Sequence, residues 1–189
     1  MTSTDRHVAF VVSSRDGHVR SLADAAVDAV TATGRRAKLL RVDDDRDDLQ
    51  RELHQAAAVV FCSPTYLGGP TWEFVRFAEW TSTLREAQTL SSKFAAGITC
   101  GFAPEGGKTG TLYYMLNLAL QHSMFWVGLP TAPSLLDYGG ARVVGNAEGH
   151  RLGVGATLGR DGLPAGALAT AHQLGDRLAS LTECWMLSA

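Results

Sequence analysis

AVVFCSPTYLGGPTWEF, residues 58–74, combines an apolar run, a loop rich in Pro and Gly, and the start of a helical pattern. Five apolar residues, 58–62, fit a β-strand buried on both faces, as in a parallel sheet covered by helices. Open α/β sheets bind ligands beyond the carboxyl ends of their strands, so the following loop, residues 63–70, is a candidate ligand site. Its Pro and Gly residues would let the backbone turn sharply and approach a flat ligand closely. Taken alone, the stretch fits an ordinary strand-to-helix connection equally well.

Outward from this stretch, strand and helix patterns alternate along the chain. Such alternation predicts an α/β fold with a parallel sheet between two layers of helices. Five strands suggest the order 2-1-3-4-5, whose switch point lies between strands one and three. Residues 130–164 are expected to form long loops that serve the function or an oligomer contact. The strands are predicted at residues 7–12, 36–42, 58–62, 93–100 and 123–129, and the helices at 19–33, 47–55, 71–80, 112–121 and from Pro164 onward.

Composition narrows the class of protein. A chain of 189 residues is expected to form one domain, residues 1–189. The net charge of −2, without a basic stripe, argues against binding nucleic acid or an anionic membrane surface. No segment resembles a signal peptide or a membrane span, so a cytoplasmic protein is expected. Cys62, Cys100 and Cys184 are widely spaced and indicate neither a disulfide framework nor a metal site; we expect buried, reduced thiols.

The loop after the first strand, residues 13–18, is a candidate anion site. It precedes a helix, whose free N–H groups and dipole can hold a phosphate. The alternative is that Ser14 or Asp16 simply caps that helix. A carboxylate directed into a phosphate site would repel the phosphate, so either Asp16 faces outward or the loop binds no phosphate. The segment 43–48, rich in Asp, is expected to be a solvated loop.

Three segments together carry a resemblance to a known family. They are residues 14–19 (SRDGHV), residues 63–70 (SPTYLGGP) and residues 121–124 (QHSM). Combined with residues 152–156 and the final helix, they resemble the flavodoxin-like NAD(P)H:quinone oxidoreductases and NADPH-dependent FMN reductases of the tryptophan-repressor-binding-protein type. The resemblance covers nearly the whole chain. It implies a flavodoxin-like three-layer sandwich with FMN as cofactor and NAD(P)H as co-substrate.

The resemblance also implies a site. The first loop would hold the FMN phosphate, the second would contact the ribityl chain and the isoalloxazine ring, and the third would flank the ring. The histidine after the fourth helix would approach the pyrimidine end of the ring and help to stabilise the reduced flavin. The implied residues are Ser14, Arg15, Gly17, His18 and Val19 in the first loop; Pro64, Thr65, Tyr66, Leu67 and Gly68 in the second; Cys100, Gly101, Gly106 and Gly107 in the third; and His122, which would also be catalytic.

The function expected from the resemblance is an FMN-dependent oxidoreductase. It would transfer hydride from NAD(P)H through FMN to a quinone or similar acceptor, with ping-pong kinetics. Cys100 is expected to pack rather than react. A homodimer or homotetramer is expected, because residues 112–120 are apolar nearly all round. Two alternatives remain open: a non-catalytic FMN electron carrier, and a flavodoxin-fold interaction module without cofactor.

Overall fold

The centre of the fold is a pair of parallel strands, β1 and β3. The computed structural model describes residues 6–104, 107–129, 146, 148 and 150–188. Every residue of β1 (His7–Val12) and β3 (Ala56–Cys62) is buried, and Phe10 of β1 lies opposite Val60 of β3. β2 (Ala37–Arg41) pairs with the outer edge of β1, and β4 (Phe94–Gly101) pairs with β3. The predicted order 2-1-3-4-5 is confirmed.

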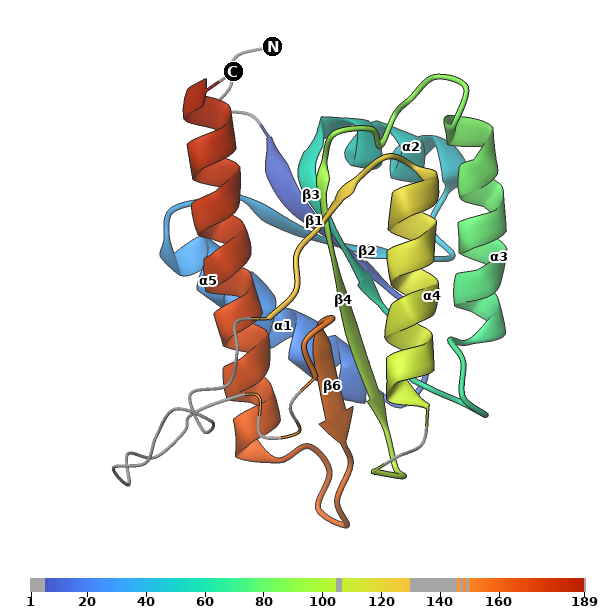
Figure 1. The fold of residues 1–189 in the computed structure, drawn as a ribbon, viewed down its shortest axis with the longest axis vertical. Coiled ribbons are helices and arrows are strands. Elements are labelled where there is room, and N and C mark those ends of the chain that lie inside the picture. Colours follow the sequence, from blue (N-terminus) through green and yellow to red (C-terminus); the bar gives the residue numbers. More distant parts are fainter. Residues whose placement is uncertain (1–5, 105–106, 130–145, 147, 149, 189) are drawn as a thin grey trace.

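Helices cover both faces of this sheet (Figure 1). Phe10 points to one face, in a core with Leu22 and Leu174, whereas Phe61 points to the other, in a core with Phe74. Because alternate strand residues are apolar on both sides, two hydrophobic layers form and the flavodoxin-like three-layer architecture is confirmed. The first face carries α1 (His18–Ala32) and α5 (Ala165–Ser188), and the second carries α2 (Arg46–Gln55), α3 (Trp72–Trp80) and α4 (Lys108–Gln121).

The acidic segment, residues 43–48, does more than solvate a loop. The side chain of Asp45 caps α2 by accepting hydrogen bonds from the backbone N–H groups of Asp47 and Asp48. Asp43 accepts two hydrogen bonds, each 2.9 Å, from the guanidinium of Arg41. Asp43 and Asp45 are exposed in the connection between β2 and α2, as expected of a solvated loop, and the cap by Asp45 in addition starts α2.

The fifth strand differs from its prediction over residues 123–129. Only β5 (Phe125–Trp126) pairs there, with the first residues of β4. The last residues of β4 instead pair with β6 (Val154–Thr157), which lies inside the stretch 130–164 that was predicted to be all loop. Leu129 and Arg151 join the two pieces by a backbone hydrogen bond of 2.9 Å. Residues 130–145 lie outside the described residues.

The three cysteines differ in their exposure. Cys62 and Cys100 are buried as expected, but Cys184 is exposed on α5, so that part of the prediction was wrong. No described helix has the length and apolarity needed to cross a membrane. Over the same residues, no group of three or more His, Cys, Asp or Glu side chains could hold a metal ion.

Candidate functional site

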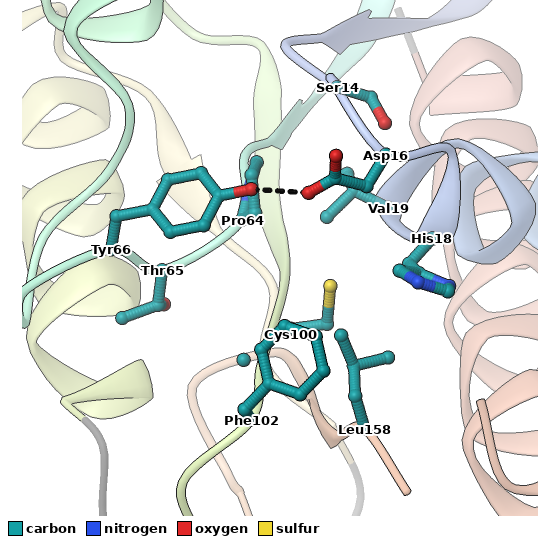
Figure 2. A pocket seen from close by; sticks show the side chains of 11 residues that line it. Ser14, Asp16, His18, Val19, Pro64, Thr65, Tyr66, Cys100, Phe102 and Leu158 are labelled. Carbon is teal, nitrogen blue, oxygen red and sulfur yellow. Dashed lines mark hydrogen bonds between the residues drawn. The ribbon is translucent and has the colours of Figure 1, made fainter. Parts of the chain in front are cut away.

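A small pocket opens at the carboxyl ends of β1, β3 and β4 (Figure 2). It lies at the switch point, where the loops after β1 and β3 diverge, as the strand order predicts. Eight predicted residues line it: Ser14, His18, Val19, Pro64, Thr65, Tyr66, Cys100 and Gly101. Asp16, Phe102 and Leu158 line it as well, and none of these three was among the predicted ligands.

The first loop leads into the N-terminus of α1 without a side-chain cap. The cap residue is Gly17, at φ 82°, a left-handed conformation that favours glycine. Neither Ser14 nor Asp16 caps the helix, so that alternative was wrong. Because no side chain occupies them, the first N–H groups of α1 remain available to an anion at this end of the pocket.

The second loop is a tight turn with a rigid base. Tyr66 and Gly69 exchange two backbone hydrogen bonds of 2.9 and 3.1 Å around Leu67 (φ 49°) and Gly68 (φ 82°), as in a type I′ turn. Leu67 is fully exposed at the tip of the turn, although positive φ is unfavourable for leucine. Such strain is typical of functional loops, and it presents an apolar side chain beside the pocket.

Buried hydroxyl groups hold the base of the second loop. The Thr65 hydroxyl lies 2.8 Å from the Thr99 hydroxyl on β4 and 2.7 Å from the Thr111 hydroxyl on α4. Across the sheet, the Ser13 hydroxyl lies 2.6 Å from the Thr71 hydroxyl, which caps α3. These pairs satisfy polar groups in the interior and fix the first two loops relative to β4 and α3.

The third loop packs directly against the second. Gly107 caps α4 at φ 81°, again without a side-chain hydrogen bond. A Cβ atom on Gly107 would lie 2.5 Å from Cα of Gly68, so only glycine permits this contact between the loops. The pocket is therefore bordered by three loops, and α1 begins beside it at a glycine in the left-handed conformation, whereas the start of α4 lines a neighbouring hollow.

Lys108 anchors the third loop, and sequence analysis missed it. Its side chain is only 1% exposed. Its Nζ donates hydrogen bonds to the carbonyl oxygens of Ala103 and Pro104, both at 3.0 Å, and to the Thr157 hydroxyl at 2.7 Å. It also lies 3.3 Å from a carboxylate oxygen of Glu148. The sequence around Lys108 does not indicate these partners, because Glu148 and Thr157 lie far from it along the chain.

Burial and hydrogen bonding set the ionisation of the groups around the pocket. Burial raises the pKa of Cys100 to about 12, so its thiol is neutral near pH 7 and unreactive, as predicted. Burial alone would raise the pKa of Glu148, but hydrogen bonds from Thr157 and the charge of Lys108 hold it below its usual value. Glu148 therefore stays ionised beside Lys108.

Tyr66 and Asp16 meet across the pocket. The Tyr66 hydroxyl donates a hydrogen bond of 2.7 Å to Oδ2 of Asp16, which joins the second loop to the first (Figure 2). This hydrogen bond, helped by partial burial, raises the pKa of Tyr66 to about 12, so the phenol is a neutral donor near pH 7. Asp16 thus remains exposed, but its carboxylate is directed towards Tyr66 rather than towards the α1 cap.

Other predicted residues lie beside the pocket rather than in its lining. Arg15 and Gly17 line a neighbouring hollow, where Arg15 donates a 2.9 Å hydrogen bond from Nε to Glu73. Leu67, Gly68 and Gly107 belong to the loops at the rim. Gly106 lies outside the described residues.

His122 is not brought to the pocket within one chain. It follows the C-terminus of α4, whereas the pocket lies near the N-terminus, about 20 Å away along a helix of 14 residues. Its Nε2 lies 2.9 Å from the Thr81 hydroxyl in the interior. Burial lowers its pKa and favours the neutral ring. In a single chain, this geometry gives no support to the predicted ring contact or catalytic role, because α4 separates His122 from the pocket.

The fold and the pocket define a class: flavodoxin-like α/β proteins with a ligand site at the switch point. The family model of NADPH-dependent FMN reductase matches residues 7–132. The chain belongs to this family, and the predicted resemblance is confirmed.

Individual relatives agree with this assignment. The chain is 33% identical over 121 residues to flavodoxin FldP of Pseudomonas aeruginosa, covering 62% of this chain and 63% of the relative. It is 35% identical over 112 residues to an NAD(P)H dehydrogenase (quinone) of Archaeoglobus fulgidus, covering 58% and 59%. The matches therefore span about three fifths of these relatives. The structure of a WrbA-like flavodoxin from Agrobacterium tumefaciens covers 95% of this chain and 98% of its own, with 27% identity and a TM-score of 0.73.

Most of the pocket fits FMN. Uncapped N–H groups at the start of α1 suit a phosphate, and Tyr66 and Phe102 offer aromatic surface for a flat ring. The glycine contacts between the second and third loops keep side chains out of this region. Asp16 is the exception, because its carboxylate would repel a phosphate.

Proposed function

We propose that this protein is an FMN-dependent oxidoreductase that transfers hydride from NAD(P)H through FMN to a quinone or similar acceptor. One observation carries the proposal: the pocket at the switch point of β1 and β3, where α1 begins after a left-handed glycine without a side-chain cap. Membership of the NADPH-dependent FMN reductase family and the quinone-dehydrogenase relative support it.

Each loop would have its own task in holding the cofactor. N–H groups at the start of α1, with the Ser14 hydroxyl, would bind the phosphate. Thr65 and Tyr66 would contact the ribityl chain and the ring, and Gly101 would let the backbone approach the ring from β4. When bound, FMN would supply the two-electron chemistry that links NAD(P)H to the acceptor.

The residues of the pocket would mainly bind and orient FMN and the two substrates. Cys100 is neutral and buried, so no thiol nucleophile takes part. Phe102 and Leu67 are strongly exposed at the rim, where a nicotinamide or a quinone could stack or pack after the other has left. One open face used in turn by both substrates gives ping-pong kinetics.

The test is steady-state kinetics on purified protein supplied with FMN. We expect oxidation of NADPH or NADH that requires both FMN and a quinone, with parallel double-reciprocal lines when both substrates are varied. No NAD(P)H oxidation by the FMN-loaded protein would contradict the enzyme proposal.

An FMN electron carrier is the second candidate, and the similarity to flavodoxin FldP favours it. A carrier would bind FMN and exchange electrons with a chemical reductant, yet remain inert to NADPH and NADH. A chain that takes up no FMN would instead fit an interaction module without cofactor.

We further propose a cytoplasmic homodimer or homotetramer. Support comes from α4 and the residues after it, whose outer surface exposes Tyr113, Leu120 and Phe125 at 53%, 56% and 48%. Grouped apolar side chains of this size on a helix are typical of a contact surface. A small-molecule acceptor, rather than nucleic acid, is the proposed partner of the pocket.

A further inference from the structure

The carboxylate of Asp16 is held in the pocket rather than left free to turn away. Its Oδ2 accepts the 2.7 Å hydrogen bond from the Tyr66 hydroxyl (Figure 2). Tyr66 is itself fixed by the backbone hydrogen bonds of its turn with Gly69. Asp16 directly precedes Gly17, the cap of α1, so the charge lies next to the N–H groups that would receive a phosphate.

The pocket offers little to balance this charge. Among the described residues that line it, there is no Lys or Arg. The nearest guanidinium in sequence, Arg15, is engaged by Glu73 through its Nε at 2.9 Å and through a second, short contact. A phosphate bound at α1 would therefore meet helix N–H groups on one side and the Asp16 carboxylate on the other.

Tyr66 fixes the direction of the Asp16 side chain through its 2.7 Å hydrogen bond. The phenol remains a neutral donor near pH 7, because its pKa is raised to about 12. The Tyr66 hydroxyl, an uncharged donor, thus directs the Asp16 carboxylate across the pocket without supplying a positive charge.

We propose that Asp16 is a specificity-determining residue that weakens recognition of the flavin phosphate, so that the pocket selects its ligand mainly through the isoalloxazine ring. The inference rests on the proposed function. It predicts that this chain discriminates poorly between FMN, which carries the phosphate, and riboflavin, which lacks it. Replacing Asp16 should restore the preference for FMN.

Equilibrium binding of the two flavins tests the proposal directly. The dissociation constants of FMN and riboflavin are measured by quenching of flavin fluorescence for the native protein and for Asp16→Asn. Asparagine keeps the size and can accept the same hydrogen bond from Tyr66. Removing one charge beside a partly solvated phosphate is expected to tighten FMN binding about tenfold. Riboflavin binding should hardly change.

Two control variants separate charge from hydrogen bonding. Asp28→Asn makes the same charge change on an exposed part of α1, about 16 Å further along the helix, and should leave both dissociation constants unchanged. Tyr66→Phe removes the hydrogen bond but keeps the carboxylate and an aromatic ring. It should raise the preference for FMN by less than Asp16→Asn does, because the carboxylate keeps its charge but is no longer held by the hydrogen bond. Thermal unfolding of each variant checks that the fold is intact.

The outcomes are distinct. A preference for FMN that rises in Asp16→Asn, rises less in Tyr66→Phe and is unchanged in Asp28→Asn supports the inference. An unchanged ratio of the two dissociation constants in Asp16→Asn overturns it, and so does an equal rise in Asp28→Asn, while the proposed function stands because flavin binds. If neither flavin binds the native protein or Asp16→Asn, both the inference and the proposed function are overturned.

Discussion

At the scale of single residues, His7 is the clearest source of pH dependence. It is buried at the start of β1, and burial, followed by the charge of Lys38, lowers its pKa from 6.5 to about 4. Glu52 lies 3.6 Å from His7 Nε2 and its charge raises the pKa of His7. Glu52 is also paired with Lys38 at 2.6 Å, and the positive charge of Lys38 opposes this effect. His7 is therefore neutral in the folded chain near pH 7.

The prediction for His7 follows from proton linkage. Between pH 6.5 and pH 4 the unfolded chain binds more protons at this position than the folded chain, so stability falls as pH falls through this window. The loss is at most about 3 kcal/mol. Urea unfolding at several pH values should show a shallower decline for His7→Leu than for the native protein. Equal slopes in the two proteins would contradict the assignment.

Lys108 gives a second prediction at this scale. Lys108→Met keeps an unbranched side chain but leaves Glu148, Thr157 and two carbonyl groups without their buried cation, at an expected cost of about 3 kcal/mol in the free energy of unfolding. Denaturant unfolding measures the loss. The exposed ion pair of Arg51 with Asp48 serves as the control, and Arg51→Met should change stability little. A loss in Lys108→Met no larger than in this control would show that Lys108 is not an anchor.

Most individual pocket residues could be predicted from sequence, but their side-chain partners could not. Ser14, Pro64 and Cys100 follow from the rule that loops at strand ends meet at the switch point. The pairing of Asp16 with Tyr66 and of Lys108 with Glu148 depends on side-chain direction between segments some 40 to 50 residues apart. No local pattern encodes such directions.

At the scale of elements, the contact of α1 with α5 depends on Gly175. A Cβ atom there would lie 2.3 Å from the carbonyl oxygen of Ala26 and 2.7 Å from Cβ of Ala29. Gly175→Ala is expected to cost about 1–3 kcal/mol, because the helices would have to move apart. For a chain of this length that lowers the melting temperature by about 3–10 °C.

Gly166 in the same helix is the matched control. A Cβ atom on Gly166 would meet nothing within 4 Å. Gly166→Ala should leave the melting temperature unchanged or raise it slightly, because alanine favours the helix. Equal melting temperatures for the two variants would show that the close contact of α1 with α5 does not limit stability.

Elements buried on both faces could be predicted with good boundaries, and elements defined by distant pairing could not. β1 and β3 are continuous apolar runs, which suffice to locate them. β5 pairs with the first residues of β4, and β6 pairs with its last residues. Because a long stretch of chain separates β5 from β6, the short apolar run of each strand does not indicate which residues pair with β4. α4 begins at Lys108, four residues before its predicted start at residue 112. Its cap is a glycine, which marks the start of a helix in a sequence less clearly than Ser, Thr or Asp does.

At the scale of the whole molecule, self-association is the first prediction. Light scattering of the purified protein should give a mass of two or four chains. Leu120→Glu would place a charge on the exposed face of α4 and should shift the mass to one chain, without lowering the melting temperature of that chain, since Leu120 is outside the core. A monomeric native protein would contradict the proposed oligomer.

The central claim is that the pocket between the loops after β1, β3 and β4 binds FMN. The most direct test is a titration of the purified protein with FMN, followed through flavin fluorescence, for the native chain and for Ser14→Glu, which adds a carboxylate to the phosphate end of the pocket. We predict saturation at one FMN per chain and binding at least about tenfold weaker in Ser14→Glu. No saturable binding, or equal affinity in the two proteins, would contradict the claim.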